Sequence, residues 1–303
     1  MLLAPYGTLY PPALATYRRI QKSYERIFPG SSIRLAFTSA LMRKRLRENE
    51  GISILSPQSA LAELSEEGTG SVVVQSLQIV PGGEFHQMAS WVADQKRRLP
   101  DPSCLKIGLP LLSGLQDCRM VSSLMPSFFR ENALPRSPDK EAMTETMKTV
   151  MKEMMTETMK EAVILVGHGT DHPADALYSL LHQIIIEEHG SVFLGTIDGY
   201  HGIDSLLADL RSTGARVVRL LPFLLVAGGH AENDIFGPGS ESIKSILEKE
   251  GYEVAADRRG LGDREEIISL FLEHTRNALE KTRCVPCSRM QESSHQKFRP
   301  TGI

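Results

Sequence analysis

The sequence predicts an α/β protein of two similar lobes, each with a mainly parallel sheet flanked by helices, and an active-site cleft between them. Two observations predict this fold class. Short β-rich runs alternate with segments of helical spacing along most of the 303 residues, and that order is typical of parallel sheets. Motifs of the first half also recur in the second half, which indicates two related lobes that face each other.

The first half follows this alternation closely. Apolar runs with β-branched residues predict strands, and apolar residues at helical spacing predict helices, one of them capped by Thr38 or Ser39. The expected strands are 2–6, 33–37, a strand from 72 and 105–109, and the expected helices are 14–28, the helix after Ser39, 59–67 and 84–98. Residues 113–137 mix apolar residues with prolines and show no sustained period, so we interpret them as a connection between the halves.

The second half repeats the alternation after a methionine-rich segment, 139–161, whose methionines form one apolar helical face. A helix packed on the sheet or on a partner subunit explains this face better than a methionine metal site does. The expected strands are 163–166, 191–197, 217–225 and 252–255, and the expected helices are 173–188, 203–210, 233–250 and 263–281. We therefore expect an N-terminal lobe with its connection (1–137), a C-terminal lobe with the candidate site (138–282) and a mobile polar tail (283–303).

The composition excludes several classes of protein. A net charge of −3 provides no basic field, so we expect no nucleic-acid partner. The longest apolar stretch, 220–227, is too short to span a bilayer, and the N-terminus lacks the basic and apolar regions of a secretory signal. We therefore expect a cytoplasmic protein without a membrane partner. Four cysteines are no disulfide framework at this length, and the single Cys-x-x-Cys, Cys284 with Cys287, lies in the polar tail.

The internal repeat places particular residues opposite one another. Pro-Tyr-Gly-Thr-Leu-Tyr-Pro at 5–11 aligns with Gly-His-Gly-Thr-Asp-His-Pro at 167–173, so Tyr6 falls where His168 falls. Ser-Ala-Leu-Ala-Glu-Leu at 59–64 aligns with Ser-Leu-Leu-Ala-Asp-Leu at 205–210, and the same offset places Glu84 where His230 falls. Duplicated lobes of this kind present polar residues from both sides of a cleft.

The residues that can carry chemistry follow three strands of the second half. His168 follows the strand 163–166, Asp198 follows the next strand, and His230 follows the strand after that. Neighbouring parallel strands bring their carboxyl ends together, and ligands bind at that edge of an open sheet. Two imidazoles and one carboxylate suit a divalent first-row metal and leave coordination positions open. The chain has no Gly-x-Ser-x-Gly elbow for acyl transfer and no Walker or Gly-x-Gly-x-x-Gly phosphate loop.

With these motifs the chain resembles the class II chelatases, in particular the sirohydrochlorin cobalt chelatases of anaerobic cobalamin synthesis, which are related to ferrochelatase. The resemblance covers most of residues 2–280. It rests on Tyr-Gly-Thr at 6–8, Arg-Leu-Ala-Phe-Thr-Ser at 34–39, Val-Val-Val-Gln at 72–75, Gly-Gly-Glu-Phe at 82–85, Gly-His-Gly-Thr at 167–170, Gly-Thr-Ile-Asp-Gly-Tyr at 195–200, Leu-Pro-Phe-Leu-Leu-Val-Ala-Gly-Gly-His-Ala at 221–231 and Gly-Leu-Gly at 260–262. It implies an enzyme of the lyase class that inserts Co²⁺ into a tetrapyrrole bound between two lobes.

The resemblance also implies roles for the strand-end residues. His168, His230 and Asp198 would be the catalytic metal ligands, two histidines and one acid. From the chemistry of metal insertion we assign proton abstraction to His168 and charge compensation to Asp198. The family more usually has glutamate at the position of Asp198, and aspartate reaches one methylene less far. No organic cofactor is expected.

Several residues are candidates for binding the carboxylates of a sirohydrochlorin-type substrate. Arginine forks suit carboxylates, which points to Arg34, Arg43 and Arg45. Tyr6 and Glu84, opposite the two histidines by the repeat, are candidates to line the cleft. His86, His172 and His201 are interpreted as structural or solvent-facing, with a second metal or haem site as the alternative.

Two alternatives stay open on the sequence alone. One is a chelatase for Fe²⁺ or Ni²⁺, because affinity order does not fix the metal that is used. The other is a protein that binds or delivers a metal or tetrapyrrole without turnover. A homo-oligomer is also compatible with the sequence, with the methionine-rich segment as one interface.

Overall fold

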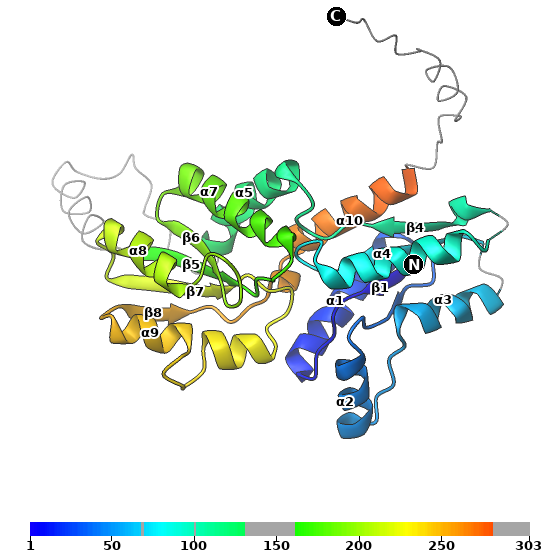
Figure 1. Cartoon of the computed structure of the whole chain (residues 1–303), viewed down its shortest axis with the longest axis horizontal. Coiled ribbons are helices and arrows are strands. Elements are labelled where there is room, and N and C mark those ends of the chain that lie inside the picture. Colours follow the sequence, from blue (N-terminus) through cyan, green and yellow to red (C-terminus); the bar gives the residue numbers. More distant parts are fainter. Residues whose placement is uncertain (68–69, 100, 131–160, 281–303) are drawn as a thin grey trace, which may run out of the picture.

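The computed structural model describes residues 1–67, 70–99, 101–130 and 161–280. Its strands form two four-stranded sheets, with the orders β2-β1-β3-β4 and β6-β5-β7-β8, and every strand pair is parallel (Figure 1). The second order is the first one displaced by four strands, which agrees with the repeat in the sequence. The predicted α/β fold with two similar lobes is confirmed.

The first sheet and its helices account for the first half of the chain. Its strands are β1 (Leu2–Ala4), β2 (Arg34–Leu35), β3 (Val72–Ser76) and β4 (Leu105–Gly108). Its helices are α1 (Pro11–Ile27), α2 (Ala40–Glu50), α3 (Pro57–Glu66), α4 (Gly83–Lys96) and α5 (Leu115–Arg130). Ser39, one of the two predicted caps, accepts a hydrogen bond from the N–H of Met42 at the start of α2.

The second sheet has the same arrangement with longer strands. Its strands are β5 (Glu161–Gly167), β6 (Val192–Thr196), β7 (Val217–Pro222) and β8 (Glu253–Ala256). Its α-helices are α7 (Ala176–His189), α8 (Ile203–Thr213), α9 (Ile243–Lys249) and α10 (Glu265–Glu280), and shorter helical turns lie at Pro173–Asp175, Ala231–Ile235 and Leu261–Asp263. Six of the seven residues of β5 are buried, because this strand lies inside the sheet with helices on both faces.

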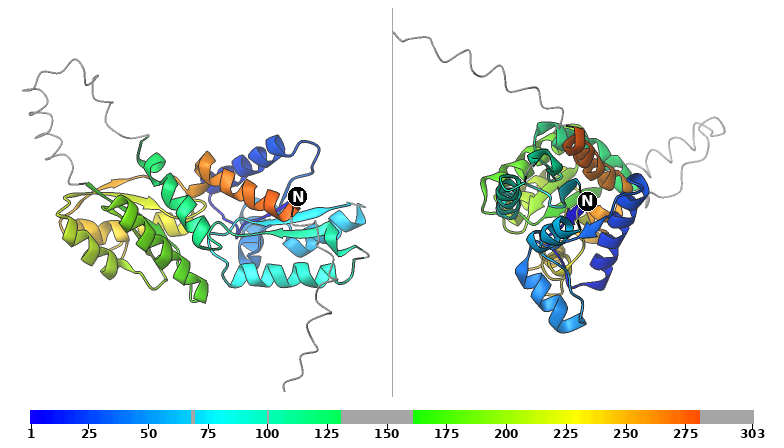
Figure 2. Two further views of the ribbon diagram at one scale, coloured as in Figure 1. Left: turned by 90° about the horizontal axis from the view of Figure 1, so that it is seen from above. Right: turned by 90° about the vertical axis from the view of Figure 1, so that its right-hand side faces the viewer.

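The two lobes exchange helices. α10 lies at the end of the described chain but packs on β3 and β4 of the first sheet (Figure 2). α5 follows the first sheet but packs against α7 of the second lobe. One cluster of buried side chains therefore contains residues of both lobes, among them Leu3, Leu165 and Phe271. The division into lobes between residues 137 and 138 stays a prediction. The helices α5 and α10 each pack on the lobe on the other side of that boundary.

Within the segment 113–137, which is interpreted from the sequence as a connection between the halves, residues 115–130 form the helix α5, which the sequence did not predict. Cys118, Val121, Met125 and Phe128 recur at helical spacing and are all buried. Pro126 lies inside this helix and hid the pattern, because proline usually ends a helix.

The expected helix 233–250 is also wrong as a single element. A π-helical turn ends at Ile235, and α9 begins only at Ile243. Gly237, Pro238 and Gly239 lie between them and interrupt the helix.

Most of the methionine-rich segment, the Cys-x-x-Cys and the polar tail lie outside the described residues. Within residues 1–67, 70–99, 101–130 and 161–280, no helix is long and apolar enough to cross a membrane.

His274 joins α10 to the first lobe and makes stability depend on pH. Its Nδ1 donates to the carbonyl of Leu109, and its Nε2 lies 3.3 Å from the carboxylate of Asp117 on α5. Burial lowers the pKa of His274, but the hydrogen bonds to Asp117 and Leu109 outweigh burial and raise the pKa above its ordinary value of 6.5. This histidine therefore adds stability that is complete below the unfolded-state pKa and is lost as the pH rises through the folded-state pKa.

We expect His274→Gln to lower the free energy of unfolding at about pH 6 by about 1.5–3 kcal/mol, the usual contribution of a hydrogen bond to a charged group. The difference between variant and wild type should shrink as the pH rises above the pKa of His274, because the wild-type imidazole then loses its charge. Urea unfolding followed by circular dichroism at several pH values measures this. A constant difference across the pH range would contradict the prediction.

Candidate functional site

The second sheet presents His168 directly after its strand β5. Gly167 is the last residue of β5, and a Cβ at this position would lie 2.6 Å from the ring of the buried Tyr178. Any larger residue here would therefore clash with that ring. Gly169 follows with φ of +80°, and a Cβ there would lie 2.4 Å from the backbone nitrogen of Gly199. The turn after β5 therefore packs backbone against backbone on the loop after β6.

The loop after β6 carries Asp198. Its N–H donates to the carbonyl of His168 at 2.8 Å, and the N–H of Ile197 donates to the carbonyl of Gly167 at 3.0 Å. The exposed carboxylate of Asp198 has its Oδ2 4.0 Å from Nδ1 of His168. His168 and Asp198, two of the predicted ligands, are therefore neighbours because backbone hydrogen bonds join their loops.

His230 reaches the same edge from β7, which pairs with β5 on the side opposite to β6. It precedes the π-helical turn Ala231–Ile235, and its Nδ1 lies 2.7 Å from Oδ2 of Asp234. Asp234 was not among the predicted site residues. The signal that could have found it is its position four residues after His230, a separation at which side chains on a helix are neighbours.

The rings of His168 and His230 lie edge to face, with centroids 4.4 Å apart, and their Nε2 atoms are 3.2 Å apart. A carbonyl and a carboxylate can only accept hydrogen bonds. Nδ1 of His168 therefore donates to the carbonyl of Gly169, and Nδ1 of His230 donates to Asp234. In their neutral forms, both imidazoles then direct an Nε2 lone pair at the other ring.

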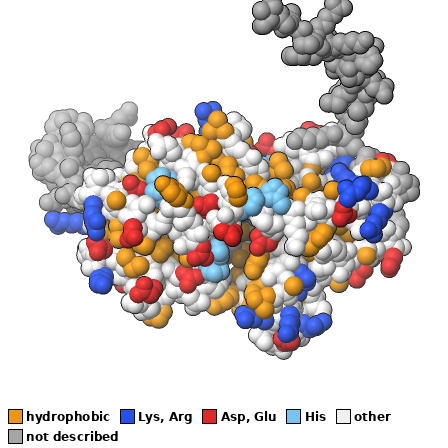
Figure 3. All heavy atoms as spheres, in the orientation of Figure 1, with side chains coloured by type: hydrophobic (Ala, Val, Ile, Leu, Met, Phe, Trp, Pro, Cys, Tyr) orange, Lys and Arg blue, Asp and Glu red, His pale blue; other side chains and the backbone are white. Residues whose placement is uncertain are grey.

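Two lone pairs at this distance repel each other unless a cation lies between them. A divalent ion about 2.1 Å from both nitrogens would make an angle of about 100° with them, between the tetrahedral and octahedral values. The side chains of His168 and His230 are 44% and 54% exposed, so other ligands can reach such an ion. The pair can therefore hold a divalent ion with open coordination positions. Figure 3 shows histidine side chains near the middle of one face, where the two lobes meet.

Residues 1–280 match the protein family described as Cobalt chelatase (CbiK). The chain belongs to the cobalt chelatase family. It is similar to the sirohydrochlorin cobaltochelatase CbiKC of Nitratidesulfovibrio vulgaris, with 31% identity over 276 residues that cover 90% of this chain and 88% of that protein. It is also similar to the sirohydrochlorin cobaltochelatase of Salmonella typhimurium, with 29% identity over 251 residues that cover 83% of this chain and 84% of that protein.

Solved structures with the same fold include sirohydrochlorin chelatases. SirB from Bacillus subtilis with Fe³⁺ superposes with a TM-score of 0.61 at 13% identity, over 92% of this chain and 95% of that one. SirB from Bacillus subtilis subspecies spizizenii in complex with cobalt gives a TM-score of 0.57 at 12% identity, over 93% and 95% of the two chains. These structures have the two-lobe chelatase fold that the sequence predicts for this cobalt chelatase family member.

The two lobes of this cobalt chelatase family member contact each other through equivalent residues. A Cβ at Gly228 would lie 3.3 Å from Oγ1 of Thr8, and one at Gly82 would lie 3.8 Å from Oγ1 of Thr170. The repeat aligns Thr8 with Thr170 and Gly82 with Gly228, so each lobe makes the same contact on the other. The lobes therefore face each other through the carboxyl ends of their sheets.

Tyr6 and Glu84 lie on the first lobe's side of this contact. Tyr6 follows β1 and is 46% exposed, and Glu84 is exposed in the first turn of α4. His86, two residues after Glu84, has its ring centroid 5.0 Å from that of His172 in the second lobe. Substrate binding by Tyr6 and Glu84 stays a prediction.

Arg34 lies away from the histidine pair. It is the first residue of β2 and pairs with Leu2, the first residue of β1, so it lies at the amino edge of the sheet. Its guanidinium forms ion pairs with Glu67 at 2.6 Å and Glu63 at 3.7 Å. The structure does not bring Arg34 to the carboxyl edge.

Arg43 and Arg45 lie on α2. Arg43 donates hydrogen bonds to the carbonyls of Phe37 and Thr38, and burial lowers the pKa of its guanidinium. Arg45 is exposed. Substrate binding by either arginine stays a prediction.

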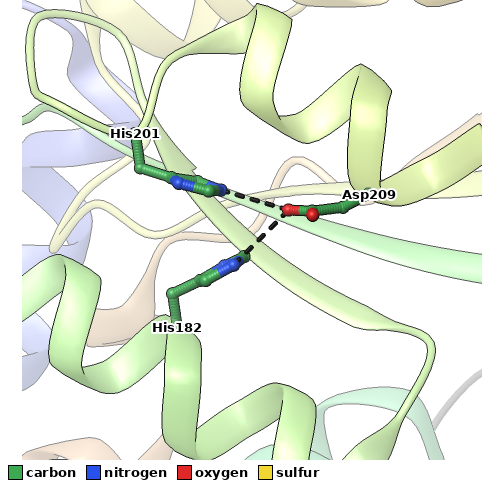
Figure 4. A group of neighbouring side chains, drawn as sticks. All are labelled: His182, His201 and Asp209. Carbon is green, nitrogen blue, oxygen red and sulfur yellow. Dashed lines mark ion pairs between the residues drawn. The ribbon is translucent and has the colours of Figure 1, made fainter.

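A second group of ligand-type side chains lies beside the Asp198 loop. His182 on α7, His201 after β6 and Asp209 on α8 point toward one another (Figure 4), with their ligand-type atoms within 4.8 Å of one another. Nε2 of His182 lies 3.4 Å, and Nε2 of His201 lies 3.3 Å, from Oδ2 of Asp209.

The protonation of His182 disfavours a metal in this second group. The N–H of Leu194 donates to its Nδ1 at 3.2 Å, so neutral His182 carries its proton on Nε2 and has no free lone pair there. Burial and the neighbouring His201 lower the pKa of His182, which keeps it neutral. Nε2 of His201 and Oδ2 of Asp209 are buried and lie 3.3 Å apart, but neither makes a hydrogen bond within the residues that the structure describes.

Proposed function

We propose that this protein inserts Co²⁺ into sirohydrochlorin and that His168 and His230 hold the ion before it is transferred. The observation that carries the proposal is the 3.2 Å approach of the two Nε2 atoms, each in a ring whose Nδ1 already donates to an acceptor. Membership of the cobalt chelatase family and the activity named for the two relatives support this reaction.

The chemistry requires a site that binds the ion without enclosing it. Two pyrrole N–H protons must leave the macrocycle as the ion enters, and an ion surrounded by protein ligands would not transfer. Two neutral imidazoles leave coordination positions for the ring nitrogens, and each imidazole can accept a proton once the ion has left. Asp234 accepts the N–H of Nδ1 of His230, which leaves Nε2 of His230 free to bind the ion. Asp198 supplies negative charge beside His168.

The test is the visible absorption of sirohydrochlorin mixed anaerobically with catalytic amounts of protein and Co²⁺. We expect several molecules of metallated product per protein chain. The same assay with Fe²⁺ and Ni²⁺ tests whether the protein prefers either ion. A spectral change that stops at one equivalent per chain would contradict the proposal and identify a carrier.

We expect Asp234→Asn to slow Co²⁺ insertion by about 10–100-fold, the usual effect of removing a carboxylate that orients a metal-binding histidine. The amide can present an N–H to Nδ1 of His230, which would turn the imidazole to its other tautomer and place a proton on Nε2. The KM for sirohydrochlorin should not change. Steady-state kinetics with each substrate varied in turn measures both effects, and an unchanged rate would contradict the role given to Asp234.

Two further predictions concern the whole protein. We propose that it acts in the cytoplasm, as the sequence predicts, and that it forms a homo-oligomer, with which the sequence is compatible. Fractionation of cells that produce the protein tests the first. Sedimentation equilibrium of the purified chain tests the second, and a single monomeric species would contradict it.

A further inference from the structure

Asp175 is a buried carboxylate that bridges the two loops of the candidate site. It is only 9% exposed, in the helical turn before α7. Its Oδ1 accepts the N–H of Thr170 at 3.0 Å, and its Oδ2 accepts the N–H of Tyr200 at 2.8 Å. Thr170 lies two residues after His168, and Tyr200 lies two residues after Asp198. One carboxylate thus holds both loops at equivalent positions.

This carboxylate does not serve its own helix. Asp175 occupies the residue before α7, where an aspartate usually accepts an N–H of the first helical turn, but it makes no such bond. Ser39 and Ser56, which precede α2 and α3, do cap their helices. Both oxygens of Asp175 are used instead by the two loops.

The loops are closely packed around Asp175. A Cβ at Gly199 would lie 2.6 Å from Oδ1 of Asp175 and 2.4 Å from Oγ1 of Thr196. On the opposite side, the N–H of Asp198 donates to the carbonyl of His168 at 2.8 Å. The two loops are therefore joined directly at Asp198 and a second time through Asp175, which closes a ring of hydrogen bonds.

We propose that Asp175 is a positioning residue that sets the separation of His168 and Asp198 and thereby the affinity for Co²⁺ before its transfer. The inference rests on the proposed function. Thr170 and Tyr200 contribute backbone N–H groups only, so the effect depends on the carboxylate of Asp175 and not on their side chains.

Two substitutions test this role at graded strength. In Asp175→Asn the side chain keeps its shape, but its amide can accept from only one of the two N–H groups and directs its own N–H at the other. In Asp175→Ala both hydrogen bonds are lost. We expect the dissociation constant for Co²⁺, followed by the visible absorption of the bound ion, to rise about tenfold for asparagine and more for alanine. The KM for Co²⁺ should rise in parallel, with the KM for sirohydrochlorin unchanged.

Asp117→Asn is the matched control. Asp117 also accepts a backbone N–H, from Ser113 at 2.8 Å, and contacts a side chain, His274, but it lies between α5 and α10. This variant should lose thermal stability without losing Co²⁺ affinity, whereas the Asp175 variants lose Co²⁺ affinity per folded molecule.

Unchanged Co²⁺ affinity in folded Asp175→Asn, with turnover by the wild type intact, would overturn the inference alone. Absence of turnover in the wild type would instead overturn the proposed function. If Asp175→Ala does not fold, the asparagine variant decides the question, because it preserves the volume of the buried side chain.

Discussion

Replacing His168 or His230 by alanine is expected to lower the rate of Co²⁺ insertion by more than about a hundredfold, since loss of an outer-sphere partner alone costs up to about that much. In the wild type the Nε2 atoms of two imidazoles face each other 3.2 Å apart, and each substitution leaves only one of these imidazoles. A single neutral imidazole does not hold a divalent ion against water at low concentration. Anaerobic absorption assays with sirohydrochlorin in excess measure the rate.

Binding of sirohydrochlorin should survive both substitutions if, as proposed, the ring is bound by the lobes and not by the ion. His189→Ala is the matched control. His189 ends α7, and its Nε2 donates to the carbonyl of Ser122 at 2.9 Å on the other side of the lobe. Insertion at the wild-type rate by His168→Ala would refute the assignment of this histidine.

The second large effect is expected at Gly169, where alanine should abolish Co²⁺ binding even though no ligand is changed. A Cβ at this position would lie 2.4 Å from the backbone nitrogen of Gly199 and 2.8 Å from the carbonyl carbon of Asp198. A flexible side chain could relieve such a clash by changing its rotamer, but backbone atoms can do so only if the loop itself moves. The Asp198 loop must therefore move away from His168, and the hydrogen bond between the two residues breaks.

Gly214→Ala separates this clash from the cost of a positive φ. Gly214 has φ of +65°, and a Cβ built there would meet no other part of the described chain within 4 Å apart from its own immediate backbone. Both variants should lose about 1–2 kcal/mol of stability from the left-handed backbone alone. Only Gly169→Ala should also lose the absorption of bound Co²⁺, and equal Co²⁺ affinity in the two variants would contradict the prediction.

The histidine pair was predictable because the topology of parallel sheets is predictable. His168 and His230 each follow an apolar strand, and β5 and β7 are paired in the sheet, so their carboxyl ends meet. The repeat also predicted two related lobes that face each other, and the contacts of Thr8 with Gly228 and of Thr170 with Gly82 agree with this. These inferences needed only strand order and direction.

The supporting carboxylates could not be predicted in the same way. Asp175 precedes a helix, where a local cap is the usual expectation, and its real partners depend on where two loops return. Asp234 lies in a π-helical turn, and its spacing of four residues from His230 indicates contact only if the segment is known to be helical. The packing of α10 on β3 and β4 could not be predicted either. The apolar face of a helix shows that it packs on a sheet but does not specify which of the two sheets it covers.

The most direct test is a crystal structure of the protein loaded with Co²⁺ without tetrapyrrole, with the ion located by anomalous scattering at the cobalt absorption edge. We predict one ion bonded to Nε2 of both His168 and His230, with at least one coordination position open to solvent. Cobalt bound at His182, His201 and Asp209, with none between His168 and His230, would contradict the proposed site.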